Sequence, residues 1–355
     1  MTPKPRVRAC GCAILPPQML RRIASRGTGP QRDAALETLA TDQTLRMSRA
    51  TYQLLEARAH RSLLSVPVPA KTRTVYDAHG AQTLPGRPVR SEGASAVADV
   101  EANEAYDGLG ATFDFFADVY DRNSIDDEGL HLDATVHYGR RYDNAFWNGQ
   151  QMVFGDGDGD LFNRFTIAID VIGHELTHGV TGDEAGLVYL GQAGALNESI
   201  SDVFGSLVKQ YARKETAVDA DWLIGAGLFT SKVQGVALRS LKAPGTAYDD
   251  PVLGRDPQPS TMAGYVKTSA DNGGVHTNSG IPNYAFYLAA VALGGHAWEK
   301  AGRIWYETLR DKRLKRTATF VQFARYTVAN AAHLFGVAER QAVAGAWAAV
   351  GIKTT

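Results

Sequence analysis

The chain has 355 residues, with 37 Lys and Arg against 38 Asp and Glu and a formal net charge of −1. This near-neutral balance argues against a nucleic-acid-binding protein, which usually carries a basic surplus. The longest apolar stretch, residues 284–295, is too short to span a bilayer. Cys10 and Cys12 are the only cysteines, so a disulfide-stapled fold is excluded. The length exceeds what one hydrophobic core usually serves, so we expect a globular monomer of two lobes, with neither nucleic acid nor membrane as a partner.

The N-terminus contains no recognisable signal peptide. An apolar run at residues 9–15 follows three basic residues, but it is short and ends at Pro16 and Pro17 without a small-residue cleavage site. We expect a soluble pro-segment or helical extension here, and cytoplasmic synthesis. Secretion by a non-classical route stays open.

The first half of the chain is predicted to be mixed α and β. Residues 17–62 have the pattern of two helical stretches, and the alternating Val and Pro of residues 66–69 indicate a linker, because an X-Pro step disfavours helix. Alternating apolar and polar residues predict short strands and turns over residues 72–89 and 130–155. Aromatic and aliphatic residues at helical spacing predict a helix over residues 96–120.

The second half is expected to be mainly helical from residue 163 onward. A region rich in Gly, Pro and Asp between about residues 235 and 274 predicts a long loop. The sequence pattern therefore predicts an α+β fold, with an α/β N-terminal lobe, a mainly helical C-terminal lobe and an additional N-terminal segment.

The five residues from His174 to His178, His-Glu-Leu-Thr-His, are the strongest indication of chemistry. Positions four apart on a helix lie one turn apart on nearly the same face, so both imidazoles can bind one metal ion. Glu175, between them, can act as a general base beside that ion. Two surface histidines on a helix would give the same pattern, so a third ligand is needed to decide.

The next predicted helix offers that ligand, because a catalytic zinc site holds three protein ligands and leaves one position open. Glu198 follows His178 by twenty positions, and an apolar stripe between residues 200 and 211 indicates that this helix is packed. Glu198 and Asp202 lie four apart at the edge of the stripe. A buried acid pair is costly without a cation, whereas a solvated acidic face is the alternative interpretation.

Four motifs in the same order resemble the thermolysin family of zinc endopeptidases over roughly residues 70–355. They are residues 142–149 with 155–159, residues 174–178, residues 194–202 and residues 271–280. Residues 12–21 resemble the short pro-segment of protealysin-like members of that family. The resemblance implies a thermolysin-like two-lobed metalloprotease fold with the zinc site in the cleft between the lobes.

Carried over motif by motif, the resemblance implies one catalytic zinc ion. Its ligands would be His174, His178 and Glu198, with Glu175 as the general base. The implied supporting residues are Asn197 and Asp202, which would orient the ligand imidazoles, Tyr189 and His276, which would stabilise the oxyanion, and Asp271, which would orient His276.

The resemblance also implies where a peptide binds. Asn144 and Ala145 would bind the substrate backbone, and Arg239 would contact the residue after the scissile bond. The apolar residues implied for the S1′ pocket are Phe162, Phe165, Val171 and Leu238. The predicted reaction is hydrolysis of peptide bonds on the N-terminal side of bulky hydrophobic residues. Protein or peptide substrates are the expected partners, and a proteinaceous inhibitor is an open addition.

The same resemblance divides the chain into four parts. They are an inhibitory pro-segment (residues 1–55) removed by self-processing, a linker (56–70), an N-terminal catalytic lobe (71–185) and a helical C-terminal lobe (186–355). Cys10 and Cys12 are candidates for a thiol switch, because a thiolate in the pro-segment is a good ligand for the open zinc position. The alternative, slightly favoured, is that both are incidental small residues in a tail.

Calcium dependence is left open. Asp170 and Asp221 match acids of thermolysin's paired calcium site, but Lys209, Leu223 and Ala226 stand where acids are expected. The ammonium group of Lys209 near Asp170 would supply the counter-charge in place of calcium.

Two other function classes use the same motifs. One is a catalytically silent metal-binding or adhesion protein on a peptidase scaffold, and the other is a non-peptidase hydrolase with the same zinc geometry. No motif is degraded, so a zinc-dependent endopeptidase in precursor form is the function that the sequence favours.

Overall fold

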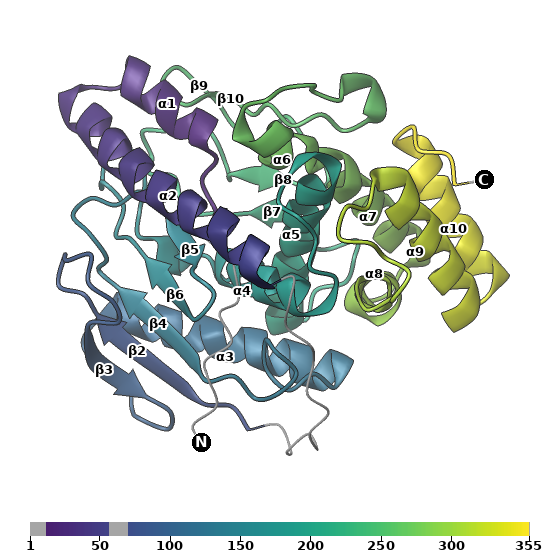
Figure 1. Cartoon of the computed structure of the whole chain (residues 1–355), viewed down its shortest axis with the longest axis horizontal. Helices are drawn as coiled ribbons and strands as arrows, with labels where there is room; N and C mark the ends of the chain where they lie inside the picture. The colour runs from purple at the N-terminus through teal and green to yellow at the C-terminus, as the bar shows by residue number, and fades with distance from the viewer. Residues whose placement is uncertain (1–11, 57–69, 355) are drawn as a thin grey trace.

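The structure, a computed structural model, describes residues 12–56 and 70–354, without the side chains of residue 12 and residues 45–56. It contains a lobe built on a sheet, a lobe built on helices, and helix α4 (Ile169–Glu184) between them (Figure 1). The predicted α+β two-lobed fold is therefore confirmed. The predicted linker at residues 56–70 lies almost wholly outside the described residues.

A six-stranded mixed sheet is the centre of the N-terminal lobe. Its strands follow the order β1 (Cys12–Ala13), β5 (Ala145–Trp147), β6 (Gln151–Phe154), β4 (Leu132–Val136), β2 (Arg73–Asp77) and β3 (Arg87–Ser91). β4 is parallel to its neighbours β2 and β6. β3 pairs antiparallel with β2, and β5 pairs antiparallel with β6. β1 pairs antiparallel with β5, with Cys12 opposite Trp147 and Ala13 opposite Phe146. The N-terminal segment thus supplies the edge strand of the sheet.

Helix α3 (Val100–Tyr120) connects the sheet to the helical lobe. It begins after Asp99, whose carboxylate accepts a hydrogen bond from the amide of Ala102, and this cap places the start later than the predicted residue 96. Its last turn stacks Tyr120 on Tyr306, with ring centroids 4.4 Å apart. The helix therefore packs on the sheet and on the second lobe at once.

A buried arginine fixes the end of α3 to the end of α4. Arg122 has no exposed surface, and its guanidinium donates to the carboxylates of Asp183 and Glu184 and to the hydroxyl of Tyr306. Removing one partner of a buried ion pair costs about 3–5 kcal/mol, because the other charge is left without compensation. This contact holds α4 in a fixed position between the lobes.

The second lobe is a helical bundle. Its helices are α5 (Gly191–Arg213), α6 (Asp271–Asn278), α7 (Gly280–Leu293), α8 (Arg303–Leu309), α9 (Phe320–Leu334) and α10 (Val337–Ala349). A capping box formed by Thr319 and Gln322 starts α9. The buried rings of Trp305 and Trp347 stack with centroids 5.9 Å apart and join α8 to α10.

The irregular region between α5 and α6 is longer than predicted. It begins at Lys214, whose left-handed φ of 56° ends α5, and not near residue 235. Two short strand pairs give it its only regular sheet structure within the described residues. They are β7 (Leu223–Ile224) with β8 (Arg239–Ser240), and β9 (Asp249–Asp250) with β10 (Gly254–Arg255).

The N-terminal segment folds into two helices, as the sequence predicts. α1 (Pro17–Arg26) and α2 (Gly29–Glu56) form a hairpin along one side of the molecule (Figure 1). Met19, Leu20 and Ile23 of α1 are fully or almost fully buried in the same core as both lobes. The segment is therefore packed as an integral part of the fold described here.

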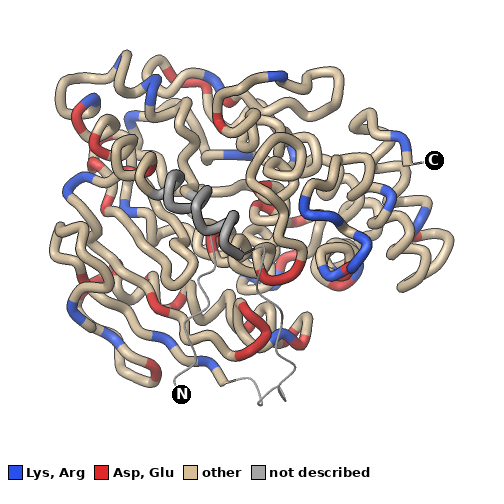
Figure 2. The backbone as a smooth tube through the Cα atoms, viewed as in Figure 1, with Lys and Arg blue, Asp and Glu red and all other residues tan. Residues whose placement is uncertain are grey.

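Charged residues of both signs are spread over both lobes (Figure 2). In the described part of the chain, every helix is too short or too polar to cross a bilayer.

Candidate active site

The site begins with the close packing of α4 against α5. Gly173 and Gly205 face each other at this crossing, and a Cβ on Gly205 would lie 2.4 Å from the carbonyl oxygen of Asp170. Only glycine allows the two backbones this approach. The glycines therefore bring the His-Glu-Leu-Thr-His turn of α4 directly over the acidic turn of α5.

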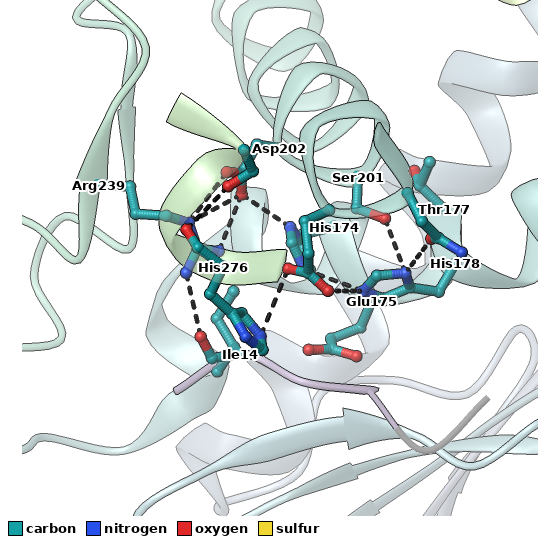
Figure 3. Close-up of polar contacts among 12 residues, drawn as sticks. Ile14, His174, Glu175, Thr177, His178, Ser201, Asp202, Arg239 and His276 are labelled. Carbon is teal, nitrogen blue, oxygen red and sulfur yellow. Dashed lines mark hydrogen bonds and ion pairs between the residues drawn. The ribbon is translucent and has the colours of Figure 1, made fainter. Parts of the chain in front are cut away.

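Three predicted ligands converge at this crossing. The Nε2 atoms of His174 and His178 lie 3.1 Å apart, and the Glu198 carboxylate lies 3.6 Å from the first and 3.5 Å from the second. One ligand atom from each side chain falls within 4.8 Å of the others, and all three side chains are buried. Figure 3 shows His174 and His178 side by side on α4, with Ile14 of the N-terminal segment next to His276 and Arg239.

The partners of the two imidazoles determine which nitrogen faces this space. Nδ1 of His174 lies 2.9 Å from the Asp202 carboxylate, and Nδ1 of His178 lies 2.8 Å from the amide oxygen of Asn197. Both partners only accept hydrogen bonds, so each Nδ1 carries the proton and each Nε2 presents a lone pair. Two lone pairs facing one carboxylate repel each other unless a cation lies between them.

The donor set fits zinc. Two neutral imidazole nitrogens and one carboxylate oxygen are the ligands of a catalytic zinc site with one position open. The Oε2 atom of Glu198 is buried and has no hydrogen-bond partner among the described residues, which leaves it available to an ion. Burial would raise the pKa of this carboxyl, but His276, His178 and His174 lower it to about 2, so Glu198 is ionised.

Glu175 lies on the same turn of α4 and is fully buried. Its Oε2 atom accepts a hydrogen bond of 3.0 Å from the backbone amide of Trp147 in β5. This contact fixes the carboxylate between the metal-binding helix and the edge of the sheet. Sequence spacing placed Glu175 beside the ion, but the Trp147 amide comes from a distant element that no local pattern reveals.

The other side of the site contains Tyr189, His276 and Asp271. The Tyr189 hydroxyl donates to Glu198 and lies 3.3 Å from Nε2 of His276. Asp271 accepts from Nδ1 of His276 at 2.8 Å and from its backbone amide at 3.0 Å. The turn before His276 uses Gly273 and Gly274 at φ of 87° and 74°, which explains the glycine pair in the sequence.

Arg239 connects the metal-binding residues to the peptide-binding side. Its guanidinium makes a fork of hydrogen bonds of 2.8–3.1 Å to the Asp202 carboxylate, which also binds His174. Burial alone would lower the pKa of Arg239, but Asp202 raises it above its usual value, so the cation persists. The remaining donor, Nη1, binds the carbonyl oxygen of Ile14 at 3.1 Å.

The N-terminal segment lies against the residues that the sequence assigns to substrate binding. The amide of Ile14 donates to the carbonyl of Ala145 at 3.1 Å, and the amide of Leu15 donates to Oδ1 of Asn144 at 2.9 Å. With the Arg239 contact, these bonds engage both predicted backbone-binding residues and the arginine predicted to contact the residue after the scissile bond. A peptide in extended form therefore already occupies this edge of the sheet.

The four residues predicted for the S1′ pocket are buried. Phe162, Phe165 and Val171 have no exposed surface and Leu238 has 2 %, and they share the core that contains Ile14. The rings of Phe162 and Phe165 lie 5.9 Å apart. Their role as a pocket lining stays a prediction.

Two contacts in the site were missed from the sequence. The Ser201 hydroxyl lies 3.0 Å from Nδ1 of His178, and the amide of Asn283 donates to Asp202 at 2.8 Å. Ser201 lies three residues after Glu198, so helical spacing could have placed it beside the site. Asn283 comes from α7, and no spacing rule connects it with α5.

Lys209 lies beside Asp170, where we expected its ammonium group to supply the counter-charge. Its buried ammonium lies 2.8 Å from Asp170, 2.7 Å from Asp221 and 2.6 Å from the carbonyl of Leu223. Burial would lower the pKa of Lys209, but the two carboxylates raise it, so the group stays charged. A cation thus already lies between these two acids, and Arg213 lies 3.4 Å from Asp221 as a second one.

The thiol hypothesis is not tested. Cys10 lies outside the described residues, and of Cys12 only the backbone, in β1, is described.

Comparison with known families gives two matches that together span most of the chain. Residues 26–182 match the thermolysin metallopeptidase catalytic domain, and residues 185–352 match its alpha-helical domain.

Individual relatives agree. An extracellular metalloprotease of Pectobacterium carotovorum is 55% identical over 96% of each chain, and protease PrtS of Photorhabdus is 48% identical over 96% of this chain and 92% of its own. Among solved structures, the precursor of protealysin from Serratia proteamaculans superposes with a TM-score of 0.88 at 56% identity, covering 96% of this chain and 99% of that one. Given these matches and the His-His-Glu site, the chain belongs to the thermolysin family of metallopeptidases, as a protealysin-like member.

Proposed function

We propose that this metallopeptidase is the precursor of a zinc endopeptidase that uses Glu175 as its base. The observation that carries the proposal is the convergence of His174, His178 and Glu198 beside Glu175, with both imidazoles fixed through Nδ1. Zinc held by these three side chains supplies a Lewis acid that polarises the scissile carbonyl and acidifies water.

The proton transfers belong to Glu175. Its carboxylate takes a proton from the attacking water as the new C–O bond forms, and it then delivers that proton to the nitrogen as the C–N bond breaks. The Trp147 amide holds the carboxylate at the edge strand, where the peptide lies. One residue can therefore reach both the water and the leaving amine.

Tyr189 and His276 stabilise the negative charge that develops on the carbonyl oxygen. Burial opposes protonation of His276, but Asp271 and Glu198 raise its pKa, which favours a ring that is protonated on both nitrogens. Such a ring donates from Nδ1 to Asp271 and from Nε2 to the oxyanion.

Substrate preference follows from the apolar set at residues 162, 165, 171 and 238. A bulky hydrophobic side chain after the scissile bond would be removed from water there, which contributes on the order of 2 kcal/mol. The burial of Ile14, whose carbonyl binds Arg239, supports this assignment.

The N-terminal segment blocks the substrate-binding residues until it is removed. The proposed parts are a pro-segment at residues 1–55, a linker at 56–70, and lobes at 71–185 and 186–355. Bonds from Ile14 and Leu15 to Asn144, Ala145 and Arg239 support blocking. The similarity to a protealysin precursor supports removal of a segment on maturation, which we place, by self-processing, between about residues 46 and 69. The Pectobacterium relative's name supports action outside the cell.

Glu175→Gln should abolish peptide cleavage while the protein keeps its zinc. The amide cannot accept the proton, but none of the three ligands is altered. The measurement is hydrolysis of a fluorogenic peptide together with metal content, with and without a chelator. Turnover comparable to the wild type would contradict the role of Glu175, and a wild-type protein that binds zinc but cleaves nothing would indicate a silent metal-binding protein.

A peptide library should show Leu, Ile or Phe immediately after the cleaved bond. Acidic residues there should be poor, because the buried apolar set cannot solvate a carboxylate. A cleavage profile dominated by Asp or Glu at this position would refute the pocket assignment.

Asn197→Ala should weaken zinc binding about tenfold, because hydrogen-bond partners of ligand imidazoles typically contribute 10–100-fold to metal affinity. Ser201 still contacts Nδ1 of His178, so the double variant with Ser201→Ala should lose more than either single one. Competition with a chromophoric chelator measures the affinity. Equal zinc affinity in all variants would show that these contacts do not orient His178.

A chelator selective for calcium should leave thermal stability unchanged, within about one degree. At a free calcium concentration one hundred times its Kd, a calcium site would contribute about 2.7 kcal/mol to the free energy of unfolding. Loss of the ion would then lower Tm by several degrees. The matched variant is Lys209→Met, which leaves Asp170 buried without a cation and should lower Tm whether or not calcium is present. A large fall in Tm on chelation in the wild type would show that Lys209 does not replace calcium.

A further inference from the structure

A carboxylate of helix α2 is buried against the substrate-binding strand. Asp42 has 1 % exposed surface, and its two oxygens accept hydrogen bonds from the Tyr142 hydroxyl at 2.7 Å and from Nδ2 of Asn144 at 2.8 Å. One helical turn earlier, the Thr38 hydroxyl accepts from the backbone amide of Asp143 at 3.0 Å. Three consecutive residues, 142–144, are thus held by one face of α2.

Both ends of the Asn144 amide are engaged by the N-terminal segment. Its oxygen accepts from the amide of Leu15 at 2.9 Å as well as from that of Ala145 at 3.1 Å, while its nitrogen donates to Asp42. Leu15 and Asp42 are 27 residues apart in sequence and both bind this side chain. The Asp42 contact also fixes which way the amide points, with its oxygen toward the strand that carries Leu15.

We propose that Asp42 is a latch that locks Asn144 in its inhibited state. Its carboxylate occupies the amide donor with which Asn144 would hold a substrate carbonyl. The proposal rests on the proposed function, in which Asn144 binds the substrate backbone. It adds a second inhibitory contact, made by α2, to the strand-like contact of residues 12–15.

The physical reason is that a substrate peptide has no group equivalent to Asp42. A peptide that pairs with β5 offers main-chain groups. The pro-segment offers the same groups and also the buried carboxylate of Asp42, which accepts hydrogen bonds from two donors. Hydrogen bonds to a charged group are stronger than those between neutral groups. The pro-segment therefore binds more tightly than a substrate of the same backbone register.

Loss of the latch also loosens β1. Without the carboxylate, Nδ2 of Asn144 and the Tyr142 hydroxyl are left as buried donors, and the amide can rotate away from Leu15. The two contacts on Asn144 are therefore cooperative, and disruption of α2 releases the strand.

The test compares full-length precursors carrying Asp42→Asn or Asp33→Asn. Both variants remove one negative charge from α2, but Asp33 is exposed and Asp42 is buried. The measured quantity is the initial rate of peptide hydrolysis by the intact precursor, divided by the rate of the same protein after maturation. Intact mass at each time corrects for material that is already trimmed.

We expect Asp42→Asn to raise this ratio roughly tenfold to a hundredfold, the range for a hydrogen bond to a charged group, and Asp33→Asn to leave it unchanged. The matured enzymes should be identical to the wild type, because residue 42 leaves with the pro-segment. An unchanged ratio for Asp42→Asn would overturn the latch.

A second pair of proteins keeps the test decisive if Asp42→Asn does not fold. Tyr142→Phe removes one donor to Asp42 from the other side of the contact and should also raise the ratio. In zinc-loaded Glu175→Gln precursors, which are expected not to self-process, Asp42→Asn or Tyr142→Phe should tighten binding of a fluorescent Ala-Leu peptide. Equal peptide affinity in all Glu175→Gln precursors would refute the latch, whereas a matured wild type without activity would refute only the proposed function.

Discussion

The buried carboxylate of Asp202 holds the two halves of the site together. It accepts hydrogen bonds from the ligand His174, from the guanidinium of Arg239 and from the amide of Asn283. Burial would raise its pKa, but Arg239 and His174 keep it below the usual range, so the charge that orients them is always present. Helix α4, the arginine that binds the carbonyl of Ile14, and α7 therefore share one anchor. A displacement of α5 would misplace all of them together.

Strand β5, which would be the edge of the sheet without β1, decides what can bind beside that anchor. One side of the strand pairs with β6, and the other pairs with β1 of the N-terminal segment. An edge strand offers main-chain groups that any extended peptide can use, so binding there is largely independent of sequence. Under the proposed function, discrimination comes from side chains: the apolar set at residues 162, 165, 171 and 238 for a substrate, and Asp42 for the pro-segment.

The parts of the site that local spacing controls could be predicted from the sequence, and the parts that packing controls could not. The four-residue separation of His174 and His178 was sufficient for the two imidazoles, because helix geometry dictates that contact. The position of Lys209 beside Asp170 was inferred from the resemblance to thermolysin's paired calcium site. Asn283 and the Trp147 amide come from elements whose approach depends on the whole fold.

The same division holds for the elements. The start of α3 was misplaced because the Asp99 cap acts through a side chain, and the early end of α5 depends on one left-handed residue, Lys214. The two helices of the N-terminal segment were predicted, but their contact with residues 142–144 was not, since it joins segments a hundred residues apart.

In the proposed precursor, covalent attachment would allow contacts of modest strength to keep the substrate-binding residues covered. Within the described residues, the segment is held by main-chain bonds at Ile14 and Leu15, by Arg22 on the carbonyls of Leu253 and Arg255, and by buried side chains of α1. While the chain is intact, these contacts are intramolecular and act at the effective concentration of a tethered ligand. A cut beyond residue 56 changes none of them, but it makes the segment a separate molecule that dilutes away. Under the proposed function, the contacts therefore need to be only strong enough for an intramolecular inhibitor, and a single proteolytic cut would reverse the inhibition.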